Sequence, residues 1–225
     1  MDLKHLAATQ ALSFVQNGMV LGLGSGSTTA IFVRLLGEQL QSGALREILG
    51  VPTSEKTAAQ ARALRLPLTT LTEHPQLDLA VDGADEVDPA LNLIKGLGRA
   101  ALREKIIESH ARRFVVIVDE SKLVPRLGRG PLPVEIVPFE AGLQVCWLNS
   151  LGCRAELWLE DDGSPIVTDN GNFLARCWFA DGIPDPYALA RTLADRPGIV
   201  GHWLFLGMAT EVIVAGEGGI RLLHR

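Results

Sequence analysis

Residues 22–29 carry glycines and hydroxyl side chains between an apolar segment and an amphipathic one. Glycine lets a backbone approach an anion closely, and the free N–H groups at a helix start attract negative charge. The segment is typical of a phosphate cradle, with Ser25, Gly26, Ser27 and Thr28 as candidate contacts. It lacks the Gly-Lys-Ser/Thr of a Walker loop, and serine stands where the dinucleotide fingerprint has its third glycine. An ordinary strand–helix turn capped by Ser27 is the alternative.

Four carboxylates, those of Asp82, Asp85, Glu86 and Asp88, lie within seven residues after an apolar segment. At the carboxyl end of a parallel strand they would line the ligand crevice. Crowded carboxylates raise one another's pKa values, which is a feature of acid–base sites. An EF-hand loop does not fit, because the glycine is second rather than sixth. A solvated acidic turn or helix cap is the alternative, and a weak magnesium site is possible but not needed.

A lysine flanked by glycine follows, in residues 95–98, and leads into Arg103-Glu104-Lys105. Glycines beside Lys95 let that lysine approach a ligand closely. Glu104 lies nine residues further on, in a predicted helix. By spacing alone, Glu104 would be a solvated salt-bridge partner and Lys122 a surface lysine.

Strands and helices alternate through the first half of the chain. Apolar periodicity predicts a helix over 3–15, and further helices over 31–40, 54–64 and 99–110. Short apolar runs predict strands over 19–23, 47–51, 77–81 and 114–118. This alternation indicates α/β crossover units and a Rossmann-like, mainly parallel sheet.

Prolines and glycines concentrate between residues 125 and 138, which indicates a boundary. A smaller inserted α+β domain is predicted over 128–203, with the Rossmann-like domain formed by 1–127 plus 204–225. Segments 204–208 and 212–215 are predicted to be strands that return to the first sheet.

Composition excludes several classes of protein. The 225 residues are 47% hydrophobic and carry a net charge of −5, so a packed core is expected and a nucleic-acid binder is not. No apolar run reaches the length of a membrane span, and the first residues do not resemble a signal peptide. Three cysteines without a Cys-x-x-Cys motif fit a reducing, cytoplasmic setting, and the histidine spacing gives no metal motif.

Taken together, the chain resembles the type A ribose-5-phosphate isomerases. Five blocks match that family in order: residues 22–28, 82–88, 95–98 with 103–105, 121–122, and 197–202 with 204–208. The resemblance implies interconversion of ribose 5-phosphate and ribulose 5-phosphate through an enediolate, in the non-oxidative pentose phosphate pathway. It also implies a homodimer or homotetramer that uses no cofactor and no metal.

Carried over by motif, Glu104 would be the base that moves a proton between C1 and C2. Asp82, Asp85 and Lys95 would lie around the ring oxygen and the reacting oxygens. A lysine and a carboxylate suit this chemistry, because aldose–ketose exchange needs proton transfer and stabilisation of an enediolate. The remaining contacts to the sugar phosphate would come from Ser25, Gly26, Ser27, Thr28, Gly83, Ala84, Gly96, Leu97, Gly98, Lys122 and Lys4.

The chain departs from the family pattern at a few positions. Leu97 and Arg99 stand where the family prefers glycine or a small residue, and Trp203 follows His202 where the family tends to be smaller or polar. Ala175-Arg176 replaces a usual aspartate. A sugar-phosphate sensor, and a deaminase or lactonase of related fold, are the competing hypotheses. The spacing of Lys95 and Glu104 and the lack of a DNA-binding segment before residue 22 favour the isomerase.

Overall fold

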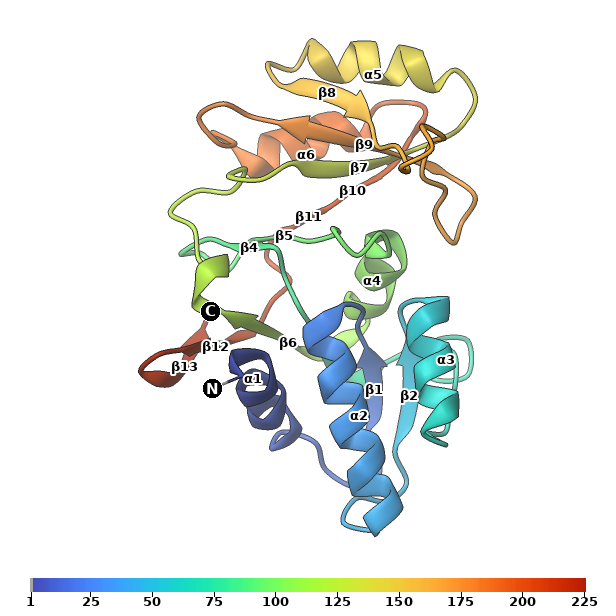
Figure 1. Ribbon diagram of the computed structural model, residues 1–225, viewed down its shortest axis with the longest axis vertical. Coiled ribbons are helices and arrows are strands. Elements are labelled where there is room, and N and C mark those ends of the chain that lie inside the picture. The colour runs from blue at the N-terminus through green and yellow to red at the C-terminus, as the bar shows by residue number, and fades with distance from the viewer. Residues whose placement is uncertain (1) are drawn as a thin grey trace.

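The computed structural model describes residues 2–225, and its largest sheet has six strands in the order β13-β12-β6-β3-β1-β2 (Figure 1). Five of these strands run parallel, and β13 pairs antiparallel with β12 at one edge. The predicted Rossmann-like, mainly parallel sheet is therefore confirmed. The strands are β1 (Val20–Leu23), β2 (Leu49–Pro52), β3 (Leu77–Asp82), β6 (Ala111–Asp119), β12 (Glu211–Gly216) and β13 (Gly219–His224).

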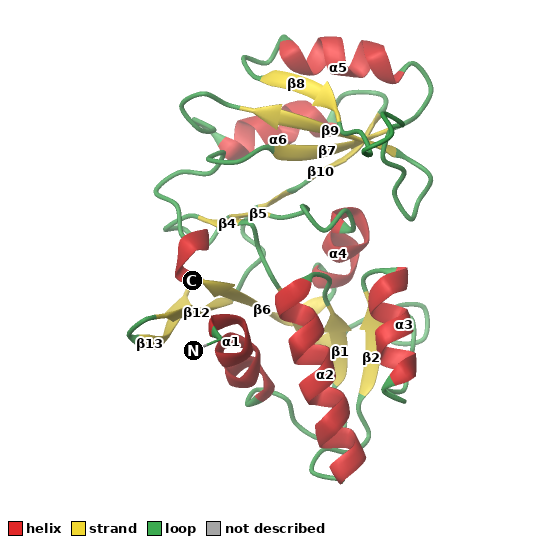
Figure 2. Cartoon of the chain, in the orientation of Figure 1, coloured by secondary structure: helices red, strands yellow, loops and turns green. Residues whose placement is uncertain are grey.

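Four helices accompany this sheet: α1 (Leu3–Leu12), α2 (Ser27–Ser42), α3 (Glu55–Ala63) and α4 (Ala101–Glu108) (Figure 2). Local signals fix several of their ends. Asp2 accepts hydrogen bonds from the first turn of α1, Ser54 caps α3, and Gly43 ends α2 in the left-handed conformation. The apolar periodicity predicted that α2 begins at residue 31, but the helix begins four residues earlier, at Ser27. The difference arises because the Ser/Thr-rich first turn carries no apolar periodicity.

Successive side chains of the central strand β6 face opposite sides of the sheet. Val115 and Ile117 pack in a core with helices α1 and α2. Phe114 and Val116 pack in a second core that also contains Leu174, from the other part of the molecule. Both faces of the sheet are therefore covered, which explains why its strands read as continuous apolar runs.

A second sheet is antiparallel, has the order β10-β7-β9-β8, and packs with helices α5 (Ala141–Asn149) and α6 (Pro186–Ala194). This is the smaller α+β part that the sequence predicted, and Figure 1 shows it above the large sheet. The precise division at 127/128 and 203/204 stays a prediction. Its strands are β7 (Leu132–Ile136), β8 (Arg154–Leu157), β9 (Phe173–Trp178) and β10 (Ile199–His202).

A third, small sheet connects the two, and it corrects one prediction. Strand β11 (Leu204–Phe205) does not return to the large sheet, but pairs with β5 (Leu93–Ile94), which pairs in turn with β4 (Glu86–Val87). The apolar run predicted the strand but not its partner. The free edge of β5, just before Lys95, supplies that partner, and the Lys95 N–H donates to the carbonyl of Trp203. β12 does return to the large sheet, as predicted.

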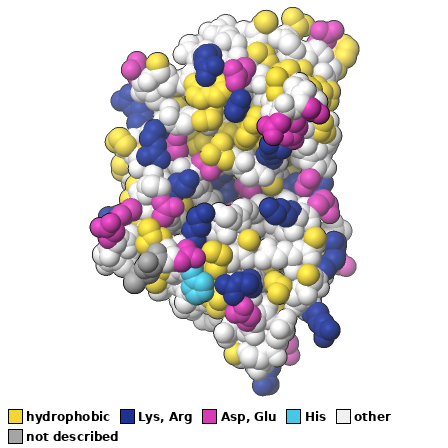
Figure 3. Space-filling view, in the orientation of Figure 1, with side chains coloured by type: hydrophobic (Ala, Val, Ile, Leu, Met, Phe, Trp, Pro, Cys, Tyr) yellow, Lys and Arg dark blue, Asp and Glu magenta, His cyan; other side chains and the backbone are white. Residues whose placement is uncertain are grey.

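Charged side chains of both signs are intermixed on the face shown in Figure 3, with no single basic patch there. That distribution agrees with the net charge of −5. Among the helices that the structure describes, none combines the length and the apolar character that a membrane span requires.

Candidate active site

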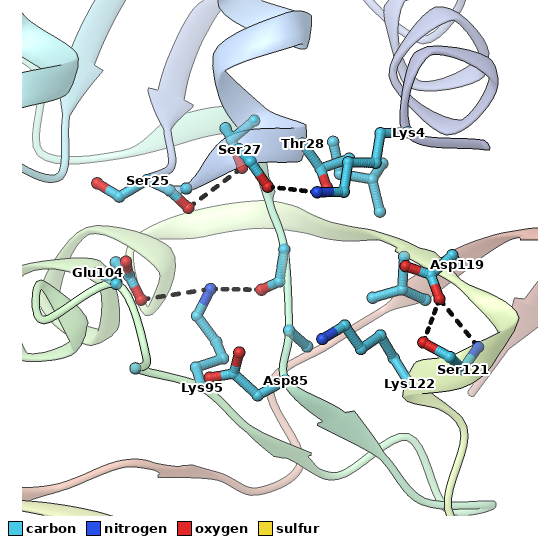
Figure 4. A pocket seen from close by; sticks show the side chains of 18 residues that line it. Lys4, Ser25, Ser27, Thr28, Asp85, Lys95, Glu104, Asp119, Ser121 and Lys122 are labelled. Carbon is cyan, nitrogen blue, oxygen red and sulfur yellow. Dashed lines mark hydrogen bonds and ion pairs between the residues drawn. The ribbon is translucent and has the colours of Figure 1, made fainter. Parts of the chain in front are cut away.

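A cavity of about 230 Å³ opens at the carboxyl ends of strands β1, β3 and β6 (Figure 4). Most of the residues singled out from the sequence line it: Lys4, Ser25, Gly26, Ser27, Thr28, Gly83, Ala84, Asp85, Lys95, Gly96, Gly98, Glu104 and Lys122. Asp82 and Leu97 do not line it. Ile117, Val118 and Asp119, which the sequence did not point to, also line the cavity. So do Thr29 and Ser121, which lie in the segments 22–29 and 121–122 but were not among the predicted contacts.

Asp82 is completely buried at the end of β3 and fixes the glycine–serine loop. Its Oδ1 accepts hydrogen bonds from the Ser25 N–H at 3.1 Å, the Thr29 hydroxyl at 2.9 Å and the Gly83 N–H at 2.7 Å. A Cβ at Gly24 would lie 2.1 Å from the Asp82 carboxyl carbon, so only glycine fits there. Asp82 therefore holds the loop from behind rather than facing the cavity.

The start of α2 forms one end of the cavity. Gly26 precedes the helix with φ 113°, and no side chain caps it, so the alternative of a turn capped by Ser27 is wrong. The Ser27 hydroxyl instead accepts a hydrogen bond of 2.9 Å from the Lys4 ammonium, which reaches in from α1. Free helix N–H groups, hydroxyls and a lysine suit a phosphate group at this end. The Ser25 hydroxyl is already engaged with those of Thr53, Ser54 and Thr57.

Two more polar groups lie beside this end. In the close-up, the side chain of Lys122 extends toward the middle of the cavity, and Asp119 lies nearby (Figure 4). Asp119 accepts hydrogen bonds from the backbone N–H and the hydroxyl of Ser121, which fixes the short turn that carries Lys122. Lys4 and Lys122 together give this end a positive charge.

The four crowded carboxylates of residues 82–88 divide between two tasks. Asp85 lines the cavity and accepts a hydrogen bond of 2.9 Å from the Leu97 N–H. Glu86 is buried away from it and accepts from the N–H groups of Gly128 and Gly130. Asp88 closes a local turn with Ala90 and Asn92. Of the four, Asp82 and Asp85 belong to the site, while Glu86 and Asp88 are structural.

Lys95 lies at the centre of the opposite end. Its ammonium donates to the Gly83 carbonyl at 2.7 Å and lies 2.7 Å from Asp82 Oδ2 and 3.4 Å from Glu104 Oε2. It also lies 3.2 Å from Glu108 Oε1. Burial alone would lower the pKa of Lys95, but the surrounding carboxylates raise it well above its ordinary value. Lys95 therefore stays charged and supplies the positive charge that these carboxylates need.

Glu104 projects from α4 into the cavity, beside the Lys95 ammonium (Figure 4). Burial raises the pKa of Glu104 to about 8, although Lys95 acts in the opposite direction. Burial also raises the pKa of Asp85, against the hydrogen bond from Leu97. A carboxylate whose pKa lies near the working pH is suited to taking up and returning a proton.

Residues 49–219 match the family model of ribose 5-phosphate isomerase A, also called phosphoriboisomerase A. The chain belongs to this family. It is 53% identical to the ribose-5-phosphate isomerase A of Roseiflexus castenholzii, over 96% of this chain and 93% of that protein. It is 47% identical to a probable chloroplastic ribose-5-phosphate isomerase of Arabidopsis thaliana, over 100% of this chain and 83% of that one.

Solved structures of ribose-5-phosphate isomerases have the same fold as this chain. A D-ribose-5-phosphate isomerase in complex with phospho-erythronic acid superposes with a TM-score of 0.97 at 42% identity, covering 100% of this chain and 98% of the other. The Plasmodium falciparum ribose 5-phosphate isomerase gives 0.96 at 34% identity, over 99% and 98% of the two chains. The chain is therefore an isomerase of the family that interconverts ribose 5-phosphate and ribulose 5-phosphate.

The structure shows the surroundings of each residue that departs from the family pattern of this isomerase. Arg99 adopts φ 68°, a conformation that glycine tolerates best, and its guanidinium binds Glu160 at 2.6 Å and stacks on Trp158. Arg176 pairs with Glu156 in the smaller sheet and also lies over Trp158. The side chain of Leu97 is 47% exposed and turned away from the cavity. None of these three side chains lines the cavity or contacts Lys95.

Trp203 is fully buried against Gly96, the residue that follows Lys95 in this isomerase. A Cβ at Gly96 would lie 1.5 Å from the indole ring, and Gly96 has φ 115°. Gly96→Ala is therefore expected to lower the free energy of unfolding by about 2–4 kcal/mol, through overpacking and backbone strain. Urea unfolding of the two proteins measures this difference.

Gly98→Ala is the matched control, because nothing lies within 4 Å of a Cβ at that position in the same loop. Its stability should stay within about 0.5 kcal/mol of the parent. Equal losses from the two substitutions would contradict the role of Trp203.

Proposed function

We propose that the cavity binds ribose 5-phosphate and isomerises it to ribulose 5-phosphate, with Glu104 as the base. The observation that carries this proposal is the placement of the Glu104 carboxylate beside the Lys95 ammonium, inside a cavity whose other end is cationic. One end then suits proton transfer, and the other suits a phosphate group.

The phosphate is placed at the start of α2. Lys4 and Lys122 would neutralise its charge, and the hydroxyls of Ser27 and Thr28 would donate hydrogen bonds to its oxygens. This end anchors the substrate without taking part in bond changes.

The proton transfer is placed at the other end. In the open-chain aldose, the Glu104 carboxylate takes the proton from C2, which leaves an enediolate whose negative charge is shared by the oxygens on C1 and C2. The proton of the C2 hydroxyl moves to the C1 oxygen, and Glu104 returns its own proton to C1, which gives the ketose. The Lys95 ammonium, held in place by Asp82, stabilises the negative charge that develops on the two oxygens.

Ring opening precedes this exchange and needs a proton acceptor for the hydroxyl on C1 and a donor to the ring oxygen. Asp85 lines the cavity, and its pKa is raised by burial. We place Asp85 at the C1 hydroxyl and Lys95 near the ring oxygen.

Phospho-erythronic acid, the ligand of the solved relative, supports this orientation by its chemistry. Its planar carboxylate has the shape and charge of the two oxygens of an enediolate, and its phosphate lies at the other end of a short chain. A compound that resembles the intermediate should bind more tightly than the sugar. Conversion of ribose 5-phosphate by the purified protein, with chelator present, tests the proposed function directly.

Turnover of a glucosamine phosphate or a gluconolactone phosphate in place of ribose 5-phosphate would favour the deaminase or lactonase hypothesis instead. Tight binding of ribose 5-phosphate without turnover would favour a sensor. Either result would overturn the proposed function.

Lys122→Ala tests the phosphate end. We expect KM for ribose 5-phosphate to rise about ten-fold with kcat within about three-fold, because a charge-assisted hydrogen bond contributes roughly 1.5–3 kcal/mol. Added salt should raise KM of the parent more than that of the variant. Steady-state kinetics at two salt concentrations measures both effects.

Arg221→Ala, which removes an exposed charge from strand β13, is the control for a change in overall charge. A lower kcat with unchanged KM in Lys122→Ala would place Lys122 at the reacting carbons rather than at the phosphate.

We further propose that the isomerase acts in the cytoplasm, in the non-oxidative pentose phosphate pathway, as a homodimer or homotetramer. The three cysteines are free, which fits a reducing setting. Phe139, just before α5, and Leu143, in its first turn, are 80% and 58% exposed, and such apolar side chains suit an interface between copies.

A further inference from the structure

Glu108 ends helix α4 one turn after Glu104, and its buried carboxylate is in ion-pair contact with the Lys95 ammonium. It is 3% exposed, and within residues 2–225 neither of its carboxylate oxygens has a hydrogen-bond partner. It does not line the cavity. An ionised carboxylate in such a place is costly, and the proposed reaction gives Glu108 no contact with substrate.

Lys95 has three N–H groups but four oxygen neighbours. The carbonyl of Gly83 and the Oδ2 of Asp82 are both 2.7 Å away and take two of these groups. Glu108 at 3.2 Å and Glu104 at 3.4 Å then compete for the third. Whether Glu104 or Glu108 accepts this hydrogen bond depends on which of the two carries a negative charge.

Charge balance requires a proton in this cluster. Oxygen atoms of Asp82, Glu104 and Glu108 all lie within 4.8 Å of one another, around a single ammonium. Three ionised carboxylates against the one ammonium of Lys95 would leave two uncompensated negative charges among side chains that are at most 4% exposed, and one would remain even with the Lys105 ammonium beside Glu108 counted. Asp82 is the poorest place for a proton, because three donors already stabilise its charge. Glu104 faces the cavity and must be ionised to act as a base.

We propose that Glu108 keeps its proton while Glu104 is ionised, and so leaves the third N–H of Lys95 to Glu104. The inference rests on the proposed role of Glu104 as the base. In this state the Glu108 hydroxyl donates to Asp82, whose Oδ2 pairs with the Lys95 ammonium at 2.7 Å but accepts no other hydrogen bond within residues 2–225. Glu108 is then a positioning residue that acts on the reaction through Lys95.

The charged groups that face Glu108 are Asp82 from β3, Lys95 after β5, and Glu104 and Lys105 from α4. Burial is the largest influence and raises the pKa of Glu108 well above its ordinary value, with Lys95 opposing it and Asp82 and Glu104 adding to it. Lys105 also loses its proton near pH 8, because burial lowers its pKa. Lys105 must therefore be left unchanged in every variant.

The first test measures where the proton is. Infrared spectra of the parent and Glu108→Gln are subtracted at a pH on the activity plateau, where the base is ionised. We expect the difference to show the loss of a carboxylic acid C=O band. A difference that shows only the loss of a carboxylate, or a plateau spectrum without the acid band, overturns the proposal. These spectra do not depend on which residue is the base, so they stay informative if Glu104→Gln retains turnover.

Glu135→Gln is the matched control for these spectra. Glu135 is also a buried glutamate, 1% exposed, but Thr168, Asn170 and Asn172 donate to its Oε1. Its replacement should remove a carboxylate band and no acid band. An acid band lost from this variant as well would show that the method does not separate the two glutamates.

The second test is the acid limb of the pH profile of kcat/KM. If Glu108 is neutral, its replacement by a neutral amide should move the midpoint by less than about 0.5 pH unit. If Glu108 is ionised, the same substitution removes a negative neighbour of Glu104 and should lower the midpoint by about one unit or more. The second outcome overturns the proposal.

The third test separates positioning from packing. Glu108→Leu fills most of the same space with an apolar side chain that cannot donate a hydrogen bond to Asp82. Lys95 is then expected to lose its fixed position. We expect kcat to fall about ten-fold with little change in KM, and the amide of Glu108→Gln to restore most of that loss. Equal kcat values for the Leu and Gln variants would exclude a positioning role.

Discussion

Glu104→Gln is expected to lower kcat roughly 10²–10⁴-fold, because a positioned general base contributes about that factor. Glutamine has the same shape but cannot take the proton from C2. The substitution removes one of the carboxylates that crowd Lys95, so the fold should be kept. KM for ribose 5-phosphate and the affinity for phospho-erythronic acid, measured by calorimetry, should stay within a few-fold of the parent. Steady-state assay of ribulose 5-phosphate formation measures the loss.

The pH profile of the parent belongs to the same prediction. Because burial raises the pKa of Glu104 to about 8, kcat/KM should rise with pH up to about that value as Glu104 loses its proton. Glu217→Gln, in the exposed turn between β12 and β13, is the control and should leave both kinetic constants unchanged. Turnover in Glu104→Gln within ten-fold of the parent would leave the family membership intact but remove Glu104 as the base.

Lys95→Met is expected to have the largest effect on stability and also to abolish most turnover. Methionine keeps much of the length, but leaves Asp82, Glu104 and Glu108 buried without their shared cation. Removing one partner from a buried ion pair costs about 3–5 kcal/mol. Urea unfolding at neutral pH should show a loss of this size, and the isomerase assay should show a loss of kcat beyond that of a partly unfolded sample.

The sign of the pH dependence identifies the cause. Without Lys95, which lowers them, the folded-state pKa values of Glu104 and Glu108 lie further above their unfolded values, so the folded state binds more protons. The stability of the variant should then increase as pH falls toward the unfolded pKa values of carboxylates, about 4, and the difference from the parent should shrink. Lys56→Met, which removes an exposed lysine from α3, should show neither effect. A loss that is the same at pH 5 and pH 8 would indicate lost packing rather than unpaired charge.

The loop of residues 95–98 shows what the local sequence can and cannot predict. Its glycines predicted a close approach to a ligand, and Gly96 and Gly98 do line the cavity. The requirement for glycine at position 96 could not be predicted from the loop itself. The clash that excludes a side chain there comes from Trp203, more than a hundred residues away in the chain. The same holds for Gly24, which is required by Asp82 from another strand.

The spacing of Glu104 and Glu108 carries a signal that the sequence analysis did not use. Two glutamates four residues apart lie on the same face of a helix, where like charges repel. Such a pair on an apolar face needs a cation or a proton. Neither the cation, Lys95, nor the burial of the pair could be read from the helix itself, since both come from elements packed against it.

The sequence by itself determined the alternation of strands and helices, the mainly parallel sheet and the family, and it singled out the loop of residues 22–29 that lines the cavity, because these depend on periodicity, chain-local turns and motif order. Tertiary structure decided which carboxylates serve the site. Asp82 pairs with Lys95 behind the cavity and Asp85 lines the cavity, while Glu86 accepts hydrogen bonds from the backbone of Gly128 and Gly130. It also decided that β11 joins β5 rather than the large sheet. Burial and pairing between distant segments set these outcomes, and neither is encoded in the spacing of neighbouring residues.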